Sequence, residues 1–153
     1  MDSIKINLRR ANFSDKDILS KWRNNIKIRE NSFNSQIISK VEHEKWFDDI
    51  FKKKDVILLI GLINKKRVGQ VRFNINGGIA KISVNVAPDK IHKGIGPILI
   101  LKGSRFLFEN TCCKKITAEI KPNNIASVKA FSKAKFKKIS SEGNKILMEY
   151  IKQ

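Results

Sequence analysis

The sequence predicts an α+β fold: a mixed, mostly antiparallel sheet of about seven strands, with about four helices on its faces. Segments of alternating or continuous apolar residues, which favour strands, are interspersed with segments whose apolar residues recur at helical spacing. Three strand segments follow one another with only short polar turns between them, as in an antiparallel meander. No repeat, low-complexity tract or linker interrupts this order, so residues 1–153 are expected to form a single domain.

The first third of the chain predicts one strand and two amphipathic helices. Residues 4–9 alternate and favour a strand. Residues 14–26 favour a helix that opens with a cap formed by Ser14 and Asp17, and a second cap, Ser39 with Glu42, opens another helix. Each helix carries one stripe of apolar or aromatic residues: Ile18, Leu19, Trp22 and Ile26 in the first, and His43, Trp46, Phe47 and Ile50 in the second.

The rest of the chain predicts the meander, two more helices and three more strands. The meander strands cover residues 55–63, 67–75 and 79–88, with turns at Asn64-Lys65-Lys66 and Asn76-Gly77-Gly78. A long apolar helix is expected from Pro97 to Phe108. The remaining elements are a strand at 114–120, a short helix at 123–134, and a hairpin of residues 136–141 and 145–151 around Glu142-Gly143-Asn144.

The chain is strongly basic, with 32 Lys and Arg against 14 Asp and Glu and a formal net charge of +18 at pH 7. This excess suits an anionic partner such as nucleic acid or phosphate, and it equally suits a solvated surface in a Lys- and Asn-rich chain. Lysines cluster at 52–54 and 133–138, but no aromatic-interleaved RNA signature or recognition-helix motif accompanies them. A nucleic-acid-binding module is therefore a secondary alternative.

The sequence contains no segment typical of a secretion signal or of a membrane-spanning helix. The amino terminus, MDSIKINLRR, lacks the apolar core and cleavage site of a secretion signal. The longest apolar run, residues 56–63, is far shorter than the ~20 residues of a membrane helix, so we expect a cytoplasmic protein without membrane insertion. Cys112 and Cys113 are adjacent, which suits neither a disulfide nor a metal clamp, and no metal is predicted.

The stretch APDKIHKGIGP, residues 87–97, predicts a phosphate-binding turn. It joins a strand to a helix with Pro97 in its first turn, where unpaired N–H groups and the helix dipole favour an anion. Gly94 and Gly96 allow a ligand to approach the backbone, and Lys93 adds a cation. A simple turn with positive φ would explain the same glycines, and the stretch lacks the further residues of a P-loop or a dinucleotide fingerprint.

The stretch SVNVAPDKIHKGIGPILI, followed by TAEIKPNNIASVKAFSKAKF, resembles the GNAT superfamily of N-acetyltransferases. The first is similar to the family's acetyl-CoA pyrophosphate loop, [QR]-x-x-G-x-[GA], and the second to its strand-Asn-helix motif ending in x-G-F. The element order is also similar, so the resemblance covers essentially the whole chain. It implies an enzyme that moves an acetyl group directly from acetyl-CoA to a primary amine.

The resemblance implies roles for individual residues. The loop amides would hold the pyrophosphate, the backbone of 84–86 would pair with the pantetheine arm, and Asn124 would contact it. Glu119 would accept the amine proton, because only a neutral amine can attack; an ordinary strand Glu paired with lysines is the alternative. The implied cofactor-binding residues are Val84, Asn85, Val86, Ile91, His92, Lys93, Gly94, Ile95, Gly96, Pro97, Asn124, Ser127 and Phe131.

Three positions depart from the family pattern. Ile91 stands where the loop has Gln or Arg, and Lys135 replaces the glycine of x-G-F. Phe131 occupies the position of a tyrosine that protonates the leaving thiolate in many members, and Phe has no proton to give. We expect Ser132, Ser127 or water to serve instead, or the thiolate to leave unassisted. A non-catalytic acetyl-CoA-binding protein is the alternative.

The acceptor side is also suggested by resemblance. Residues 22–33, WRNNIKIRENSF, and the pattern I-S-x-x-x-H-x-x-W-F from residue 38 are similar to the subgroup that acetylates 4-amino sugars on UDP in bacterial surface-glycan (pseudaminic-acid-type) synthesis. They are less similar to the branch that acetylates ribosomal protein amino termini, and a polyamine-like or antibiotic amine is a third option. In both subgroups the first two helices wall the acceptor cleft.

The implied substrate-binding residues are Trp22, Arg23, Asn24, Arg29, His43 and Trp46. For a nucleotide-linked acceptor, the arginines would meet the diphosphate and a Trp would stack on the base or sugar. The two Trp and the His lie on apolar stripes, so a core role is the alternative for each. The oligomeric state stays open, with a homodimer among the options.

Overall fold

The computed structural model describes residues 4–153 and contains a seven-stranded sheet in this part of the chain. The three preceding residues, part of the stretch considered as a secretion signal, lie outside the described residues. The elements in chain order are β1 (Asn7–Arg10), η1 (Phe13–Asp15), α1 (Lys16–Asn24), α2 (Ile26–Glu30), α3 (Lys40–Ile50), β2 (Val56–Ile63), β3 (Lys66–Asn76), β4 (Ile79–Val86), η2 (Pro88–Lys90), α4 (Ile95–Asn110), β5 (Lys115–Ile120), α5 (Ile125–Lys133), β6 (Lys137–Glu142) and β7 (Lys145–Ile151).

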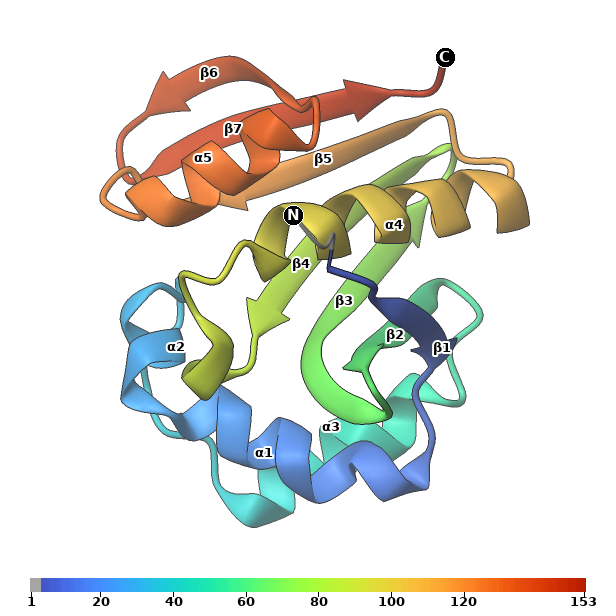
Figure 1. Ribbon diagram of the computed structural model, residues 1–153, viewed down its shortest axis with the longest axis vertical. Coiled ribbons are helices and arrows are strands. Elements are labelled where there is room, and N and C mark those ends of the chain that lie inside the picture. Colours follow the sequence, from blue (N-terminus) through green and yellow to red (C-terminus); the bar gives the residue numbers. More distant parts are fainter. Residues whose placement is uncertain (1–3) are drawn as a thin grey trace.

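The sheet has the order β1-β2-β3-β4-β5-β7-β6. All neighbouring strands are antiparallel except β4 and β5, which are parallel, and this confirms the predicted mixed, mostly antiparallel α+β fold. The β4–β5 pairing covers only Ile79–Lys81 opposite Lys115–Thr117. Beyond it the two strands diverge, as Figure 1 shows.

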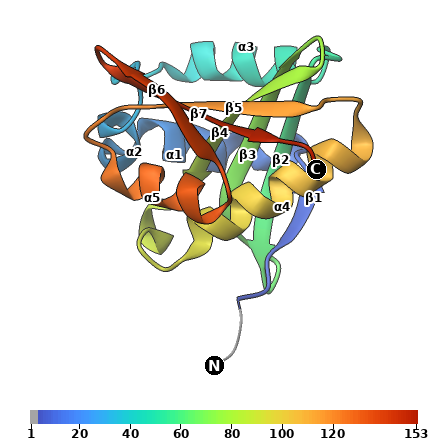
Figure 2. The same cartoon turned by 90° about the horizontal axis from the view of Figure 1, so that it is seen from above.

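Helices cover both faces of the sheet, with α3 and α4 on opposite sides in Figure 2. Strand β2 illustrates the consequence for the sequence: Ile57 and Leu59 belong to the cluster under α4 and α5, whereas Leu58 and Ile60 belong to the cluster under α1–α3. A strand buried on both faces has no polar side, so its sequence is a continuous apolar run rather than an alternating one. No helix in the described part of the chain is long and apolar enough to cross a bilayer.

Helix α4 approaches the sheet closely because glycines face it. The fully buried Leu99 lies over Gly61 of β2 and Gly69 of β3. A Cβ atom at Gly61 would lie 2.4 Å from Leu99 Cδ2, and one at Gly69 would lie 2.5 Å from Leu99 Cδ1 and 2.7 Å from the Asn85 carbonyl oxygen. Gly69 has no room for a side chain while β4 keeps its place, whereas a side chain at Gly61 would require the ends of the Leu99 and Ile6 side chains to shift.

A buried carboxylate ties the amino-terminal segment to the sheet. Asp15 has no exposed surface and accepts hydrogen bonds from Arg9 at 2.8 Å, from Arg67 Nε at 2.7 Å and from the Asn12 N–H at 2.8 Å. Burial alone would raise the pKa of Asp15, but these donors outweigh it and lower the pKa to about 2. The carboxylate thereby joins β1, η1 and β3.

The helix predicted over residues 14–26 is wrong in its cap and its continuity. Asn12 rather than Ser14 is the capping residue, and it caps the short turn η1: its Oδ1 accepts the Ser14 N–H, and Asp15 accepts the Asn12 N–H in return, whereas α1 has no side-chain cap. Helix α1 ends at Asn24 because Asn25 is extended, and the Asn25 side chain caps a separate helix, α2, at Lys27. The chain therefore has one α-helix more than predicted in the described residues.

The other elements agree with the predictions to within a few residues. The Ser39 cap is confirmed, since Ser39 Oγ accepts the Glu42 N–H at 3.1 Å. The first strand is displaced, covering Asn7–Arg10 rather than residues 4–9. The long apolar helix starts two residues before Pro97, so Gly96 lies inside its first turn rather than in the loop.

Replacing Asp15 by Asn should lower the free energy of unfolding by about 3 kcal/mol, because it removes a buried carboxylate that pairs with both Arg9 and Arg67. The Asp15 pKa is below its ordinary value of 3.8, so this stabilisation is complete above pH 3.8 and is lost as the pH falls toward 2. Urea unfolding of both proteins at pH 6 and pH 2.5 measures it. Asp48→Asn, which loses an exposed ion pair with Lys16, should change stability by no more than about 0.5 kcal/mol.

Gly69→Ala should destabilise the fold by about 1–3 kcal/mol, because the added methyl group meets Leu99 and the β4 backbone. Gly78→Ala is the matched control, since nothing lies within 4 Å of a Cβ there. Thermal unfolding compares the two variants. Equal stability of both would mean that α4 can shift outward without cost.

Candidate active site

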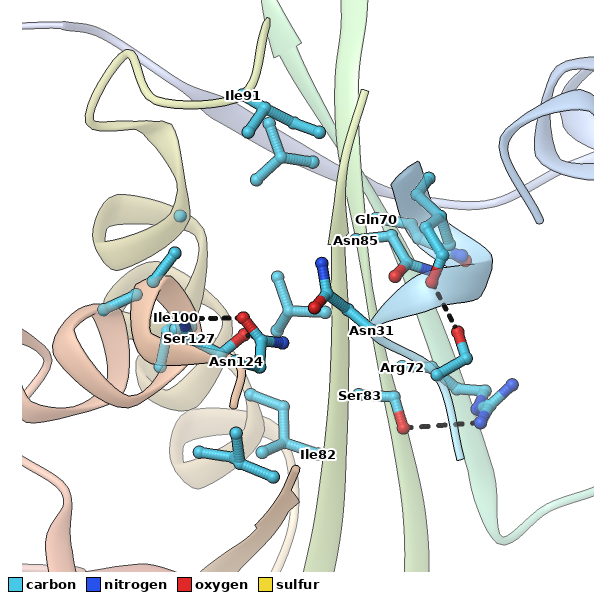
Figure 3. Close-up of a pocket in the computed structure, with 18 of the residues that line it drawn as sticks. Asn31, Gln70, Arg72, Ile82, Ser83, Asn85, Ile91, Ile100, Asn124 and Ser127 are labelled. Atoms are coloured by element: carbon cyan, nitrogen blue, oxygen red, sulfur yellow. Dashed lines mark hydrogen bonds between the residues drawn. The ribbon is translucent and has the colours of Figure 1, made fainter. Parts of the chain in front are cut away.

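A cleft of about 1150 Å³ opens where β4 and β5 diverge. One side is lined by residues of α1, α2 and α3, and the other by the turn after β4, by α4 and by α5. Figure 3 shows its polar side chains, including Gln70 and Arg72 from β3, Ser83 and Asn85 from β4, and Asn124 at the beginning of α5. The cleft thus gathers residues from almost the whole length of the chain.

The edge of β4 forms part of this cleft. Residues Ile82–Val86 pair with β3 on one side, but no strand of the described residues pairs with them on the side of β5. Such an edge presents backbone N–H and C=O groups that an extended ligand can pair with. The expected pantetheine-pairing residues, Val84, Asn85 and Val86, all line the cleft.

The turn after β4 presents free backbone donors to the cleft. The N–H groups of residues 91–94 donate to no acceptor within residues 4–153, and the first turn of α4 has no side-chain cap. His92 and Gly94 have φ values of 66° and 78°, which direct the turn around its inner surface. Free amides at the start of a 16-residue helix fit an anionic group such as a pyrophosphate.

The second motif places a polar pair beside that turn. Asn124 caps α5: its Oδ1 accepts the Ser127 N–H at 3.2 Å, and its Nδ2 donates to Ser127 Oγ at 3.0 Å. Both residues line the cleft, as does the buried Phe131. Lys135, where the family motif has glycine, has a φ of 75°, so the chain keeps the left-handed turn with a side chain that rarely adopts it.

Glu119 lines the cleft from the end of β5. Its carboxylate lies 2.9 Å from Lys81 Nζ and 3.3 Å from Lys145 Nζ. The hydrogen bond from Lys81, with a smaller effect of Lys145, lowers the pKa of Glu119 below its ordinary 4.5 despite partial burial. The carboxylate is therefore ionised near neutral pH, and it has both the ion pairs and the cleft position that the sequence left as alternatives.

Most of the residues predicted to bind the cofactor or to take part in catalysis line the cleft, and two of them do not. Lys93 and the proposed acid Ser132 are exposed and are not part of the cleft lining. Ser132 is exposed on α5 and lies outside the lining, although its chain neighbours Phe131 and Lys133 line the cleft. The predicted residues that do line it are Val84, Asn85, Val86, Ile91, His92, Gly94, Ile95, Gly96, Pro97, Glu119, Asn124, Ser127 and Phe131.

Of the six residues predicted to bind the acceptor, three line the cleft and three do not. Arg23, His43 and Trp46 line the cleft. Trp22, Asn24 and Arg29 do not: Trp22 is a core residue, only 5% exposed, and Asn24 exchanges two hydrogen bonds with the backbone of Ile38, each 2.8 Å long. Arg29 lies on the short helix α2, whose separation from α1 was not predicted.

His43 is buried, and its Nδ1 atom has no partner among the described residues. Burial, followed by the charges of Lys16 and Arg23, lowers the pKa of His43. The imidazole is therefore neutral at pH 7, and it packs against Trp46 at a centroid distance of 5.4 Å.

Strand β3 contributes three polar residues to the cleft that were not predicted from the sequence. Gln70, Arg72 and Asn74 all line the cleft. They occupy alternate positions, and residues two apart on a strand share a face. Polar residues at every second position of an otherwise apolar strand were the signal that could have identified them.

Solved structures share this fold. A domain from Methanocaldococcus jannaschii DSM 2661 is 25% identical, with a TM-score of 0.84 over 97% of this chain and 99% of that chain. Spermidine N-acetyltransferase from Vibrio cholerae, in complex with CoA and spermine, is 19% identical, with a TM-score of 0.88 over 96% and 95%. Campylobacter jejuni N-acetyltransferase PseH is 16% identical, with a TM-score of 0.74 over 97% and 99%. No curated protein sequence matches the chain.

The family model of the acetyltransferase (GNAT) domain matches residues 5–137. This span includes the free edge of β4, the turn with its unpaired amides and the Asn124 motif, which are the features that the sequence resemblance rested on. The expected acetyltransferase class is thereby confirmed. The chain belongs to the family of GNAT acetyltransferase domains.

Proposed function

We propose that this protein transfers an acetyl group from acetyl-CoA directly to a primary amine, with both substrates bound in the cleft at once. The observation that carries the proposal is that unpaired amides at the start of α4 and the unpaired edge of β4 face the same cleft. Acetyl-CoA supplies the reactive thioester. The turn at residues 91–97 would hold its pyrophosphate, the backbone of 84–86 its pantetheine arm, and Asn124 and Ser127 the adjoining polar groups.

The protein's task at the reaction centre is to orient the amine and to accept its proton. Glu119 is our candidate base, acting directly or through water, because it is an ionised carboxylate in the cleft lining. Holding the amine beside the thioester supplies a large part of the rate in such a scheme. Neither cysteine has a place in it, since direct transfer needs no covalent enzyme intermediate.

For the leaving thiolate, Ser127 is a better-placed proton donor than Ser132, which is outside the cleft lining. Ser127 Oγ accepts a hydrogen bond from Asn124, so its own O–H stays available to donate. A thiolate is also stable enough to leave with a proton from water alone.

The first-choice acceptor is the 4-amino group of a UDP-linked sugar, and the alternative is a protein amino terminus. The nucleotide-sugar choice rests on the motif of residues 38–47 and on the arginine and Trp side chains of the acceptor wall. The similarity to PseH, at 16% identity, supports the fold and does not identify the acceptor. A non-catalytic or nucleic-acid-binding protein is the alternative from another class.

Calorimetric titration should give saturable 1:1 binding of acetyl-CoA that persists at high salt, whereas any binding of a short RNA duplex should fade. Gly94→Val should weaken acetyl-CoA binding at least tenfold, because a β-branched residue disfavours the φ of 78° that shapes the turn. Gly143→Val is the matched control: it strains a turn of similar φ, 56°, in the β6–β7 hairpin. Tight RNA binding without acetyl-CoA binding would refute the proposed function.

Glu119→Gln should lower kcat/KM by roughly 10²–10⁴ with unchanged acetyl-CoA affinity, because the base is lost while the cofactor contacts stay. Release of the CoA thiol, measured with a panel of amines, gives the rate. Glu149→Gln is the matched control, since Glu149 is a strand carboxylate paired with Lys115 at 3.5 Å and is not part of the cleft lining. Equal activity of both variants would reduce Glu119 to an ion-pair residue.

A further inference from the structure

We propose that Arg23 and Arg72 form a subsite for an anionic group of the acceptor, so that the enzyme selects amines that carry a phosphate or carboxylate. This inference rests on the proposed function and deepens it. Arg72, on β3, has no counterpart in the motifs that suggested the acceptor wall.

The two guanidinium groups have no carboxylate partner among the described residues. Arg23 and Arg72 both line the cleft, yet no carboxylate of residues 4–153 lies within 4.0 Å of either side chain. Burial and the charge of Arg23 lower the pKa of Arg72, and burial and the charge of Arg29 lower the pKa of Arg23, so each guanidinium lies near another cation. An anion between them would relieve this repulsion.

The N–H groups of Arg23 and Arg72 donate only to neutral oxygen atoms, and one buried nitrogen of Arg23 has no acceptor among the described residues. Arg72 donates from Nε to Asn74 Oδ1 at 3.2 Å and from Nη2 to Ser83 Oγ at 3.3 Å, and both acceptors are neutral. Arg23 donates from Nη2 to the Asn34 carbonyl at 2.8 Å, while its buried Nη1 has no partner among the described residues. Phosphate and carboxylate oxygens are the acceptors that match such planar, charged donors.

Contacts within the protein hold the Arg72 side chain in place without a ligand. Its guanidinium lies over the Trp46 ring at 5.5 Å from the centroid, and Ser83 anchors its far side, as Figure 3 shows for the Ser83 bond. A guanidinium fixed by stacking and by hydrogen bonds loses little conformational entropy on binding an anion. Ser83 is the residue before Val84, so the subsite adjoins the β4 edge where the thioester arm would lie.

The charge of the whole cleft agrees with this selectivity. Besides the two arginines, lysines of α2, β4 and α5 line it, against only Glu42 and Glu119 as carboxylates in its described lining. Glu119 is already paired with two lysines. A polycationic acceptor such as a polyamine would meet repulsion here, whereas an anionic amine would be attracted.

The direct test is a calorimetric titration of inorganic pyrophosphate and of succinate into the protein saturated with CoA, at fixed ionic strength. Saturation with CoA occupies the turn at residues 91–97, so the added anion reports on the second site. We expect one further anion to bind, and Arg72→Gln to weaken it at least tenfold. The probe that binds more tightly identifies the acceptor group as phosphate or carboxylate.

Arg105→Gln is the matched control, because it removes the same charge from an exposed position of α4 outside the cleft lining. It should leave the affinity within twofold of the original protein, and Arg72→Lys, which keeps the charge, should retain an intermediate affinity if Arg72→Gln is misfolded. No binding of either anion, or equal weakening by Arg72→Gln and Arg105→Gln, would overturn the subsite. Because the readout is binding, this outcome is distinct from a failure of acetyl transfer.

A second test compares glucosamine 6-phosphate, glucosamine and spermidine as acceptors. The phosphorylated amine should have the highest kcat/KM, and Arg72→Gln should reduce its advantage over glucosamine at least tenfold through KM. Preference for spermidine would overturn the inference while supporting acetyl transfer itself.

Discussion

The contact of Leu99 with Gly61 and Gly69 is the constraint on which the rest of the structure depends. Because neither glycine has a side chain, α4 settles directly on β2 and β3; a methyl group at either position would meet the Leu99 side chain, and one at Gly69 would also meet the Asn85 carbonyl oxygen of β4. The position of α4 then sets its amino terminus beside the end of β4, where a Cβ at Gly96 would lie 3.9 Å from Val86 Cγ2 and 3.6 Å from Ala130 Cβ. The turn, the strand edge and α5 therefore meet at one point.

One side of the cleft is formed mainly by backbone groups and the other mainly by side chains. The side assigned to acetyl-CoA consists mainly of backbone: free amides in the turn and an unpaired strand edge. Backbone groups do not depend on side-chain identity, which explains how Ile91 can stand where the family pattern has Gln or Arg. The opposite side consists of side chains from helices α1–α3 and from β3, so these side chains can change without loss of the backbone groups on the first side.

Some basic side chains are paired with carboxylates, whereas two arginines in the cleft are not. The Asp15 carboxylate pairs with both Arg9 and Arg67 where the amino-terminal segment joins the sheet, and the Glu119 carboxylate pairs with both Lys81 and Lys145. Arg23 and Arg72 have no such partner in the described residues, although they lie in the cleft rather than on an open surface. The net charge of +18 therefore includes clusters in which one carboxylate faces two cations and, in the cleft, two arginines without a carboxylate partner in the described residues.

The sequence by itself determined the order of the elements, the fold class and the donor-side motif, because periodicity, turn residues and the glycine pattern are local properties of the chain. It also identified Asn124, whose cap is made within three residues. Local pattern failed at Ser14, where Asp15 instead pairs with Arg67, 52 residues away, and at Asn25, which divides the predicted first helix. Only the tertiary structure decided which side chains share the cleft. Trp22 turns into the core, Ser132 faces outward, and Arg72 stacks on Trp46 from another element, because such neighbours are set by how the sheet and helices pack.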